Sequence, residues 1–278
     1  MKGMNSLALA AALMLWAAAA NAQTFDLGKY PDFSGQWNRI GVPRWIAPGE
    51  KAPLTAEYQQ IFEANLKDQA NGGPGDWPST FCIPQGMPAM MNLYDPMEIV
   101  VTPEVTYILI SHVNDSYRRI YTDGRDWPPE SEIERTYAGY SIGRWIDSSG
   151  SGRFDRLEIE TRYLRGPRGI EASGLPTHHD NQSIIKEVIH LDPADPDVIL
   201  DELTLIDHAL TRPWTSVKKA RRERNPVWAS DVCPDDGTHV RIGKDTFYLS
   251  ADGKLMPTRK GEPPPDLSYF PNAERAGK

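Results

Sequence analysis

Apolar residues occur along this chain in short runs, and segments rich in Gly and Pro separate them. This pattern is typical of many short strands joined by turns. A chain of short strands with almost no intervening helix predicts an antiparallel sheet that closes into a barrel or folds into a sandwich. The predicted strands span residues 97–101, 105–112, 116–122, 140–146, 154–163, 183–191, 198–208 and 215–221.

The segment FDRLEIETRY shows the strand alternation most clearly. Charged residues occupy every second position, so one face of this strand is expected to be solvated and the other packed. The predicted packed face carries Leu157, Ile159, Thr161 and Tyr163.

One helix is predicted after residue 55. Thr55 is suited to cap its N-terminus, and Glu57 favours the positive end of its dipole. Apolar residues then recur at helical spacing on one face, and the segment NGGPG from Asn71 ends the helix. The face is predicted to consist of Tyr58, Ile61, Phe62 and Leu66.

The N-terminus has the pattern of a secretory signal peptide. Lys2 precedes an apolar run at residues 7–20, and Ala-Asn-Ala follows as a cleavage signal. We therefore predict a signal peptide at 1–22, a single barrel domain at 23–245 and a Pro-rich tail at 246–278. The protein is expected to be periplasmic or secreted, with no membrane span, because no later stretch approaches about 20 apolar residues.

The chain has two cysteines, Cys82 and Cys233. In an exported protein a disulfide persists, so we predict one structural bridge between them. It would close a loop of about 150 residues, which is a large entropic constraint on the unfolded chain.

Charge and motifs exclude several classes of function. The formal net charge is −8, and no basic stripe runs along the chain, so a nucleic-acid partner is not expected. The one basic cluster, residues 218–224, is interpreted as a solvated strand end. No nucleotide-binding signature is present, so no cofactor is predicted, and the sequence leaves the oligomeric state open.

The strand at 183–191 carries candidate chemistry. Alternation places Glu187 on the packed face, where a carboxylate must be paired or protonated. His179 precedes Glu187 by eight residues, and alternation along the next strand predicts that Asp207 points inward at its end. These three groups are predicted to form a general acid–base site, with Arg119 and Tyr121 binding a substrate oxygen. The alternative is a satisfied buried polar network without catalysis.

A metal site is a weaker interpretation of the same region. His178, His179 and Asp180 are suitable ligands for zinc or iron. Consecutive residues of an extended chain point to opposite sides, however, so two adjacent histidines rarely bind one ion. This interpretation would make the protein a metal-dependent hydrolase.

Aromatic residues in or beside the strands indicate a binding cavity for a hydrophobic small molecule. Core packing explains any one of them equally well. The predicted lining residues are Tyr107, Tyr117, Tyr140, Trp145 and Trp214.

Six ordered segments resemble those of a large family of exported bacterial proteins that begin with a DFSGxW segment. They are DFSGQW, PQGMPAMM, MEIVVTPEVTYIL, YRRIYTDGR, GYSIGRW and TRPW, within residues 32–233. The resemblance implies a lipocalin-like β-barrel whose first Trp closes one end, in bacteria that often degrade aromatic, terpenoid or steroid compounds. The spacing of His179 and Glu187 and the place of Asp207 match the family pattern. The additional His178 leaves the matching histidine open.

The sequence therefore predicts a periplasmic barrel that performs cofactor-independent acid–base chemistry on an aromatic or isoprenoid substrate, as a lyase, dehydratase or isomerase. A non-catalytic binding or carrier protein for such a molecule is the alternative, because both functions use the same cavity.

Overall fold

The computed structural model describes residues 25–112, 114–166, 169–227, 233, 239–242, 245–249 and 255–256. The predicted signal peptide, residues 1–22, lies outside the described residues. The chain divides into two compact units, Met1–Ser230 and Asp231–Lys278.

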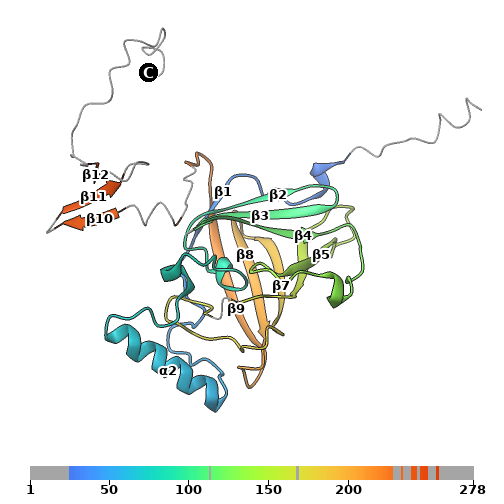
Figure 1. Cartoon of the computed structure of the whole chain (residues 1–278). Coiled ribbons are helices and arrows are strands. Elements are labelled where there is room, and N and C mark those ends of the chain that lie inside the picture. The colour runs from blue at the N-terminus through green and yellow to red at the C-terminus, as the bar shows by residue number, and fades with distance from the viewer. Residues whose placement is uncertain are drawn as a thin grey trace, which may run out of the picture. The chain divides into compact units, whose positions relative to one another are not determined.

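Nine strands of the first unit form a closed barrel in sequence order, which confirms the predicted all-β barrel (Figure 1). The barrel closes where the last strand pairs with the first. The strands are β1 (Gln36–Arg39), β2 (Met97–Val101), β3 (Val105–His112), β4 (Asn114–Tyr121), β5 (Tyr140–Ile146), β6 (Arg156–Arg162), β7 (Ile184–Asp192), β8 (Asp195–Ile206) and β9 (Trp214–Glu223).

One pairing departs from the antiparallel pattern. β4 and β5 run parallel and pair only at Ile120 with Ser141 and at Tyr121 with Ile142. Parallel neighbours require a crossover, and residues 122–139 supply it by returning the chain to the end where β4 began. Two pairs of neighbouring strands, β4 with β5 and β1 with β2, share only two residue pairs each. All other neighbouring strands of the barrel share more.

The barrel interior follows the strand alternation. Leu157, Ile159 and Thr161 of β6 are buried, as predicted, whereas Tyr163 lies beyond the strand end at a φ of 59°. Trp37 of β1 is fully buried. Its indole N–H donates to the carbonyl oxygen of Phe33 at 2.9 Å, and the guanidinium of Arg222 lies 4.4 Å from the ring centroid.

The predicted helix is α2 (Ala56–Ala70). Thr55 caps it by accepting from the backbone N–H of Tyr58, and the helix ends before Asn71, as predicted. Its buried face is narrower than the sequence indicates. Tyr58 and Phe62 are buried, whereas the two other predicted residues of that face, Ile61 and Leu66, are exposed. The buried face of α2 therefore consists of two residues four positions apart, Tyr58 and Phe62.

Cys82 and Cys233 are disulfide-bonded, which confirms the predicted bridge. In the second unit, β10 (His239–Ile242), β11 (Asp245–Leu249) and β12 (Leu255–Met256) form an antiparallel sheet. The predicted barrel domain extended to residue 245, but the last barrel strand ends at Glu223. Pairing of β9 with β1 leaves the barrel no free edge to which later strands could add.

In the described part of the chain, no helix has the length and apolar character needed to cross a membrane.

Candidate functional site

A buried ion pair lies inside the barrel. Arg118 of β4 and Glu187 of β7 have side chains that are 1% and 0% exposed. Nη1 of Arg118 donates to Oε1 of Glu187 at 2.8 Å, and Nη2 donates to Oε2. The guanidinium also donates to the hydroxyls of Ser141, at 3.1 Å, and Thr161, at 2.7 Å. All four residues are buried, and their side chains form one hydrogen-bonded network.

Glu187 points inward, as the sequence predicts. The arginine that contacts it is Arg118 and not the predicted Arg119. Arg119 is exposed on the outer face of β4, and Arg118 is the inward residue. The apolar Ile120 could have indicated which side of β4 faces the interior. Side chains alternate along a strand, so an inward Ile120 requires an inward Arg118 and an outward Arg119.

Asp201 of β8 is a second buried carboxyl near this network. Neither of its oxygens has a hydrogen-bond partner. Burial, followed by the charge of Glu187, raises the pKa of Asp201 well above its ordinary value. The neutral acid is therefore the favoured form. Strand alternation on β8 places Asp201 on the same face as Leu203 and Leu205, and sequence reasoning did not single it out.

Lys218 on β9 is the neighbour of Asp201 in the strand register. Its ammonium donates to the carbonyl oxygen of Arg44 at 2.7 Å and lies 4.9 Å from the centre of the Trp45 ring. Burial lowers the pKa of Lys218 to about 8. The interpretation of residues 218–224 as a solvated strand end is therefore wrong for Lys218, which faces the same side as the buried Trp214.

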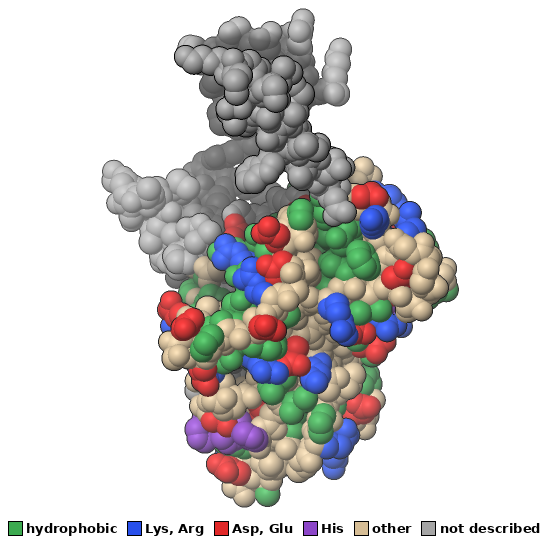
Figure 2. All heavy atoms as spheres, turned by 90° about the vertical axis from the view of Figure 1, so that its right-hand side faces the viewer, with side chains coloured by type: hydrophobic (Ala, Val, Ile, Leu, Met, Phe, Trp, Pro, Cys, Tyr) green, Lys and Arg blue, Asp and Glu red, His purple; other side chains and the backbone are tan. Residues whose placement is uncertain are grey.

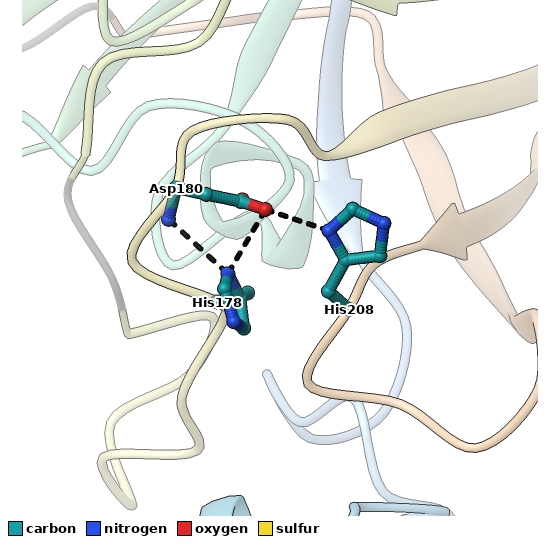
Figure 3. Close-up of side chains that lie close together, drawn as sticks. All are labelled: His178, Asp180 and His208. Carbon is teal, nitrogen blue, oxygen red and sulfur yellow. Dashed lines mark hydrogen bonds and ion pairs between the residues drawn. The ribbon is translucent and has the colours of Figure 1, made fainter.

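His178 and His208 lie close together in loops at one end of the barrel, and both contact Asp180 (Figure 3). Oδ2 of Asp180 lies 3.0 Å from Nδ1 of His178 and 2.6 Å from Nδ1 of His208. The two histidine contacts and a backbone N–H of Gln182 outweigh partial burial and lower the pKa of Asp180 to about 2. Contact with Asp180 raises the pKa of His208. We call His178, Asp180 and His208 the His–Asp cluster.

His179 lies beside this cluster and is exposed. Its Nδ1 is 2.7 Å from the hydroxyl of Tyr58, the buried tyrosine in the first turn of α2. The ring of His179 stacks on that of His178, with centroids 4.4 Å apart. Sequence reasoning did not predict Tyr58 or His208 as members of this region, because both come from segments distant in the chain.

Asp207 joins two loops instead of facing Glu187. Its Oδ1 accepts from the backbone N–H groups of His178, at 2.9 Å, and Ala209, at 2.8 Å. Its Oδ2 accepts from the hydroxyl of Ser183 at 2.5 Å. The expected convergence of His179, Glu187 and Asp207 is therefore wrong. Glu187 is bonded to Arg118 inside the barrel, whereas the other two lie in the end loops.

The other predicted site residues line a hollow on the outer face of the barrel. Its volume is about 410 Å³, and Tyr117, Arg119, Tyr121 and Tyr140 form one wall. The rings of Tyr121 and Tyr140 lie 4.8 Å apart. The guanidinium of Arg119 lies 4.9 Å from the centre of the Tyr117 ring. We call this space the tyrosine hollow. The chain segments that complete it contribute Pro84, Gly86, Met90, Glu134, Thr136 and Tyr137.

The remaining predicted lining residues are divided. Tyr107 hydrogen-bonds with Arg119 and raises the pKa of that guanidinium. Trp145 lines a second, wider hollow of about 790 Å³ together with Tyr30, Trp127 and Phe154. Trp214 is buried against Trp45 in the core, with centroids 6.1 Å apart, so its predicted role as a lining residue is wrong.

The chain matches no family model, no curated protein and no solved structure. Its function must therefore be inferred from the geometry of its own sites.

Proposed function

We propose that this protein binds an aromatic or isoprenoid small molecule in the tyrosine hollow and acts as a non-catalytic carrier in the periplasm. The observation that carries the proposal is the gathering of Tyr117, Tyr121 and Tyr140 with Arg119 around one space of about 410 Å³. Pockets for small molecules usually have volumes of about 300–1,000 Å³ and walls that are mostly apolar or aromatic.

The exposure of Tyr117 supports this proposal. This residue is 53% exposed although it lies in a strand of the barrel. An aromatic ring that is left in water gains free energy when a flat apolar molecule covers it. The ring faces of the tyrosines would bind such a molecule by stacking, and Arg119 would donate to an oxygen atom on it.

The contacts of the predicted acid–base groups favour binding over catalysis. Glu187 is fully bonded to Arg118 and is shielded from solvent. Asp207 is occupied by two backbone N–H groups and a hydroxyl. A general acid or base must reach the proton of a substrate. Neither carboxylate lines the tyrosine hollow.

Export is the other part of the proposal. The disulfide between Cys82 and Cys233 is compatible with an oxidising compartment, as is the signal-peptide pattern of residues 1–22.

The test uses 2-naphthol and geraniol as aromatic and isoprenoid probes, with isothermal titration calorimetry as the measurement. We expect Tyr117→Ala and Arg119→Met to weaken binding of at least one probe about tenfold or more. Tyr30→Ala is the matched control, because this tyrosine lines the second hollow. The same probe is incubated with the wild type and analysed by mass spectrometry, and no conversion is expected.

Unchanged affinity in both hollow variants, or an equal loss in Tyr30→Ala, would remove the tyrosine hollow as the binding site. Conversion of a bound probe would favour the enzymatic alternative.

A further inference from the structure

We infer that the His–Asp cluster binds one divalent transition-metal ion of the zinc class through His178, Asp180 and His208. A ring nitrogen of each histidine and a carboxylate oxygen of Asp180 all lie within 4.8 Å of one another. This site goes beyond the proposed binding function, because it lies at the end loops and shares no residue with the tyrosine hollow.

The distances suit a single ion. Zinc binds nitrogen and oxygen ligands at about 2.0–2.2 Å, so ligand atoms in a tetrahedral site lie about 3.4 Å apart. Oδ2 of Asp180 is 3.0 Å from Nδ1 of His178 and 2.6 Å from Nδ1 of His208. Figure 3 shows both imidazoles directed at this one oxygen. Small side-chain rotations would open the three atoms to the spacing that zinc requires.

The fold brings the three ligands together. β7 and β8 pair antiparallel, with Ile184 opposite Ile206, so the loop before β7 and the turn after β8 lie at the same barrel end. The first loop carries His178 and Asp180, and the second carries His208. Asp207 fixes the two segments to each other, because its Oδ1 accepts from the backbone of both His178 and Ala209. Asp207 is therefore a positioning residue for the site.

A second layer of contacts orients the ligands, as in known metal sites. Oδ1 of Asp180 accepts from the backbone N–H of Gln182 at 2.9 Å, which leaves Oδ2 directed at the histidines. The ring of His178 packs against two others, with centroids 4.4 Å from His179 and 5.1 Å from Tyr58. Tyr58 and His179 are themselves joined by a hydrogen bond.

The site is open to solvent. The side chain of His208 is 71% exposed, and those of His178 and Asp180 are partly exposed. Figure 2 shows histidine side chains together at the surface near the lower edge of the molecule. Two imidazoles and a carboxylate suit zinc, iron or nickel and not calcium or magnesium, which prefer oxygen ligands. Three protein ligands leave a coordination position for water or a small ligand.

The chain provides a matched control. His112 and Asp95 form a pair with the same atoms in contact, Nδ1 and Oδ2. Among the residues that the structure describes, no third His, Cys or carboxylate completes this pair as a metal-binding group. It tests whether one histidine with one aspartate is sufficient for binding.

The experiment titrates zinc into tag-free, chelator-treated protein by isothermal calorimetry, and thermal melting is recorded with and without zinc. We expect one ion per chain and a rise in Tm, because zinc binds the folded state. His208→Ala and Asp180→Asn should weaken affinity at least tenfold and abolish the rise in Tm, whereas His112→Ala should leave both unchanged. The exposure of His208 makes its variant a safe test, since little packing is lost.

Equal zinc affinity in the wild type, His208→Ala and Asp180→Asn would overturn the inference. So would the absence of zinc binding at about 100 µM in the wild type, or an equal loss of affinity in His112→Ala.

Discussion

Arg118 and Glu187 join two strands that are not neighbours. Their two parallel hydrogen bonds, one of 2.8 Å, connect β4 to β7 through the barrel interior, and the hydroxyls of Ser141 and Thr161 on β5 and β6 complete the network. Every polar atom of the guanidinium that faces the interior thus has a partner. The pair acts as an internal brace across four consecutive strands.

Arg118→Met should lower the free energy of unfolding by about 3–5 kcal/mol, because it leaves the buried Glu187 carboxylate without a counter-charge. The double variant with Glu187→Met should lose less than this. Urea denaturation measures both. Arg144→Met is the control, since its pair with Glu158 is exposed and should contribute at most about 1 kcal/mol. A loss below 1 kcal/mol in Arg118→Met would contradict the brace.

Asp201 should make the protein less stable as the pH rises. Burial raises the pKa of Asp201 in the folded state well above its ordinary value, so above about pH 4 the folded state binds more protons than the unfolded state. For one additional bound proton in the folded state, the free energy of unfolding falls by up to about 1.4 kcal/mol for each unit by which the pH rises. Asp201→Asn removes this contribution.

Urea denaturation of both proteins from pH 4 to pH 8 tests the sign. The variant should gain stability relative to the wild type as the pH increases. Parallel curves for the two proteins would show that Asp201 does not titrate in this way.

Asp207→Ala should loosen both end loops. It leaves the backbone N–H groups of His178 and Ala209 and the hydroxyl of Ser183 without their acceptor. We expect a loss of about 2–3 kcal/mol and faster hydrogen exchange at these two amides, as measured by NMR. Asp207→Asn retains one side-chain acceptor and should show a smaller effect. Unchanged exchange at both amides in Asp207→Ala would argue against this role of Asp207 in joining the two loops.

The disulfide should stabilise the protein mainly by restricting the unfolded chain. Replacing both Cys82 and Cys233 by Ser should lower the free energy of unfolding by about 2–5 kcal/mol, since the closed loop is about 150 residues long. Denaturation in guanidinium chloride measures the loss. Wild-type protein reduced with dithiothreitol should then have the same stability as the variant. If the reduced protein were as stable as the oxidised protein, this account would be refuted.

Strand positions were predictable from the sequence because alternation is a local property. Runs 97–101, 105–112 and 140–146 coincide with β2, β3 and β5, and Thr55 begins α2 where its capping chemistry indicates. Burial of Glu187 followed from its aliphatic neighbours Ile185 and Ile189. Each of these features depends on residues within one element.

The sites depend on pairings between elements, which the sequence does not display. The adjacent Arg118 and Arg119 differ only in the face they occupy, and Ile120 is the single residue that determines it. The sequence pattern predicts His208 within a strand, but β8 ends at Ile206, and the following turn directs His208 toward Asp180. The tyrosine hollow needs the chain at residues 84–90 beside the outer face of β4.

The short parallel contact of β4 and β5 lies within the wall of the tyrosine hollow. Tyr121 belongs to one strand and Tyr140 to the other, so the width between their rings follows the separation of strands that share only two residue pairs. The wall of the hollow therefore includes a boundary at which two neighbouring strands share few backbone pairs. If the hollow binds a small molecule as proposed, a displacement of either strand would change the spacing of two rings that contact this molecule.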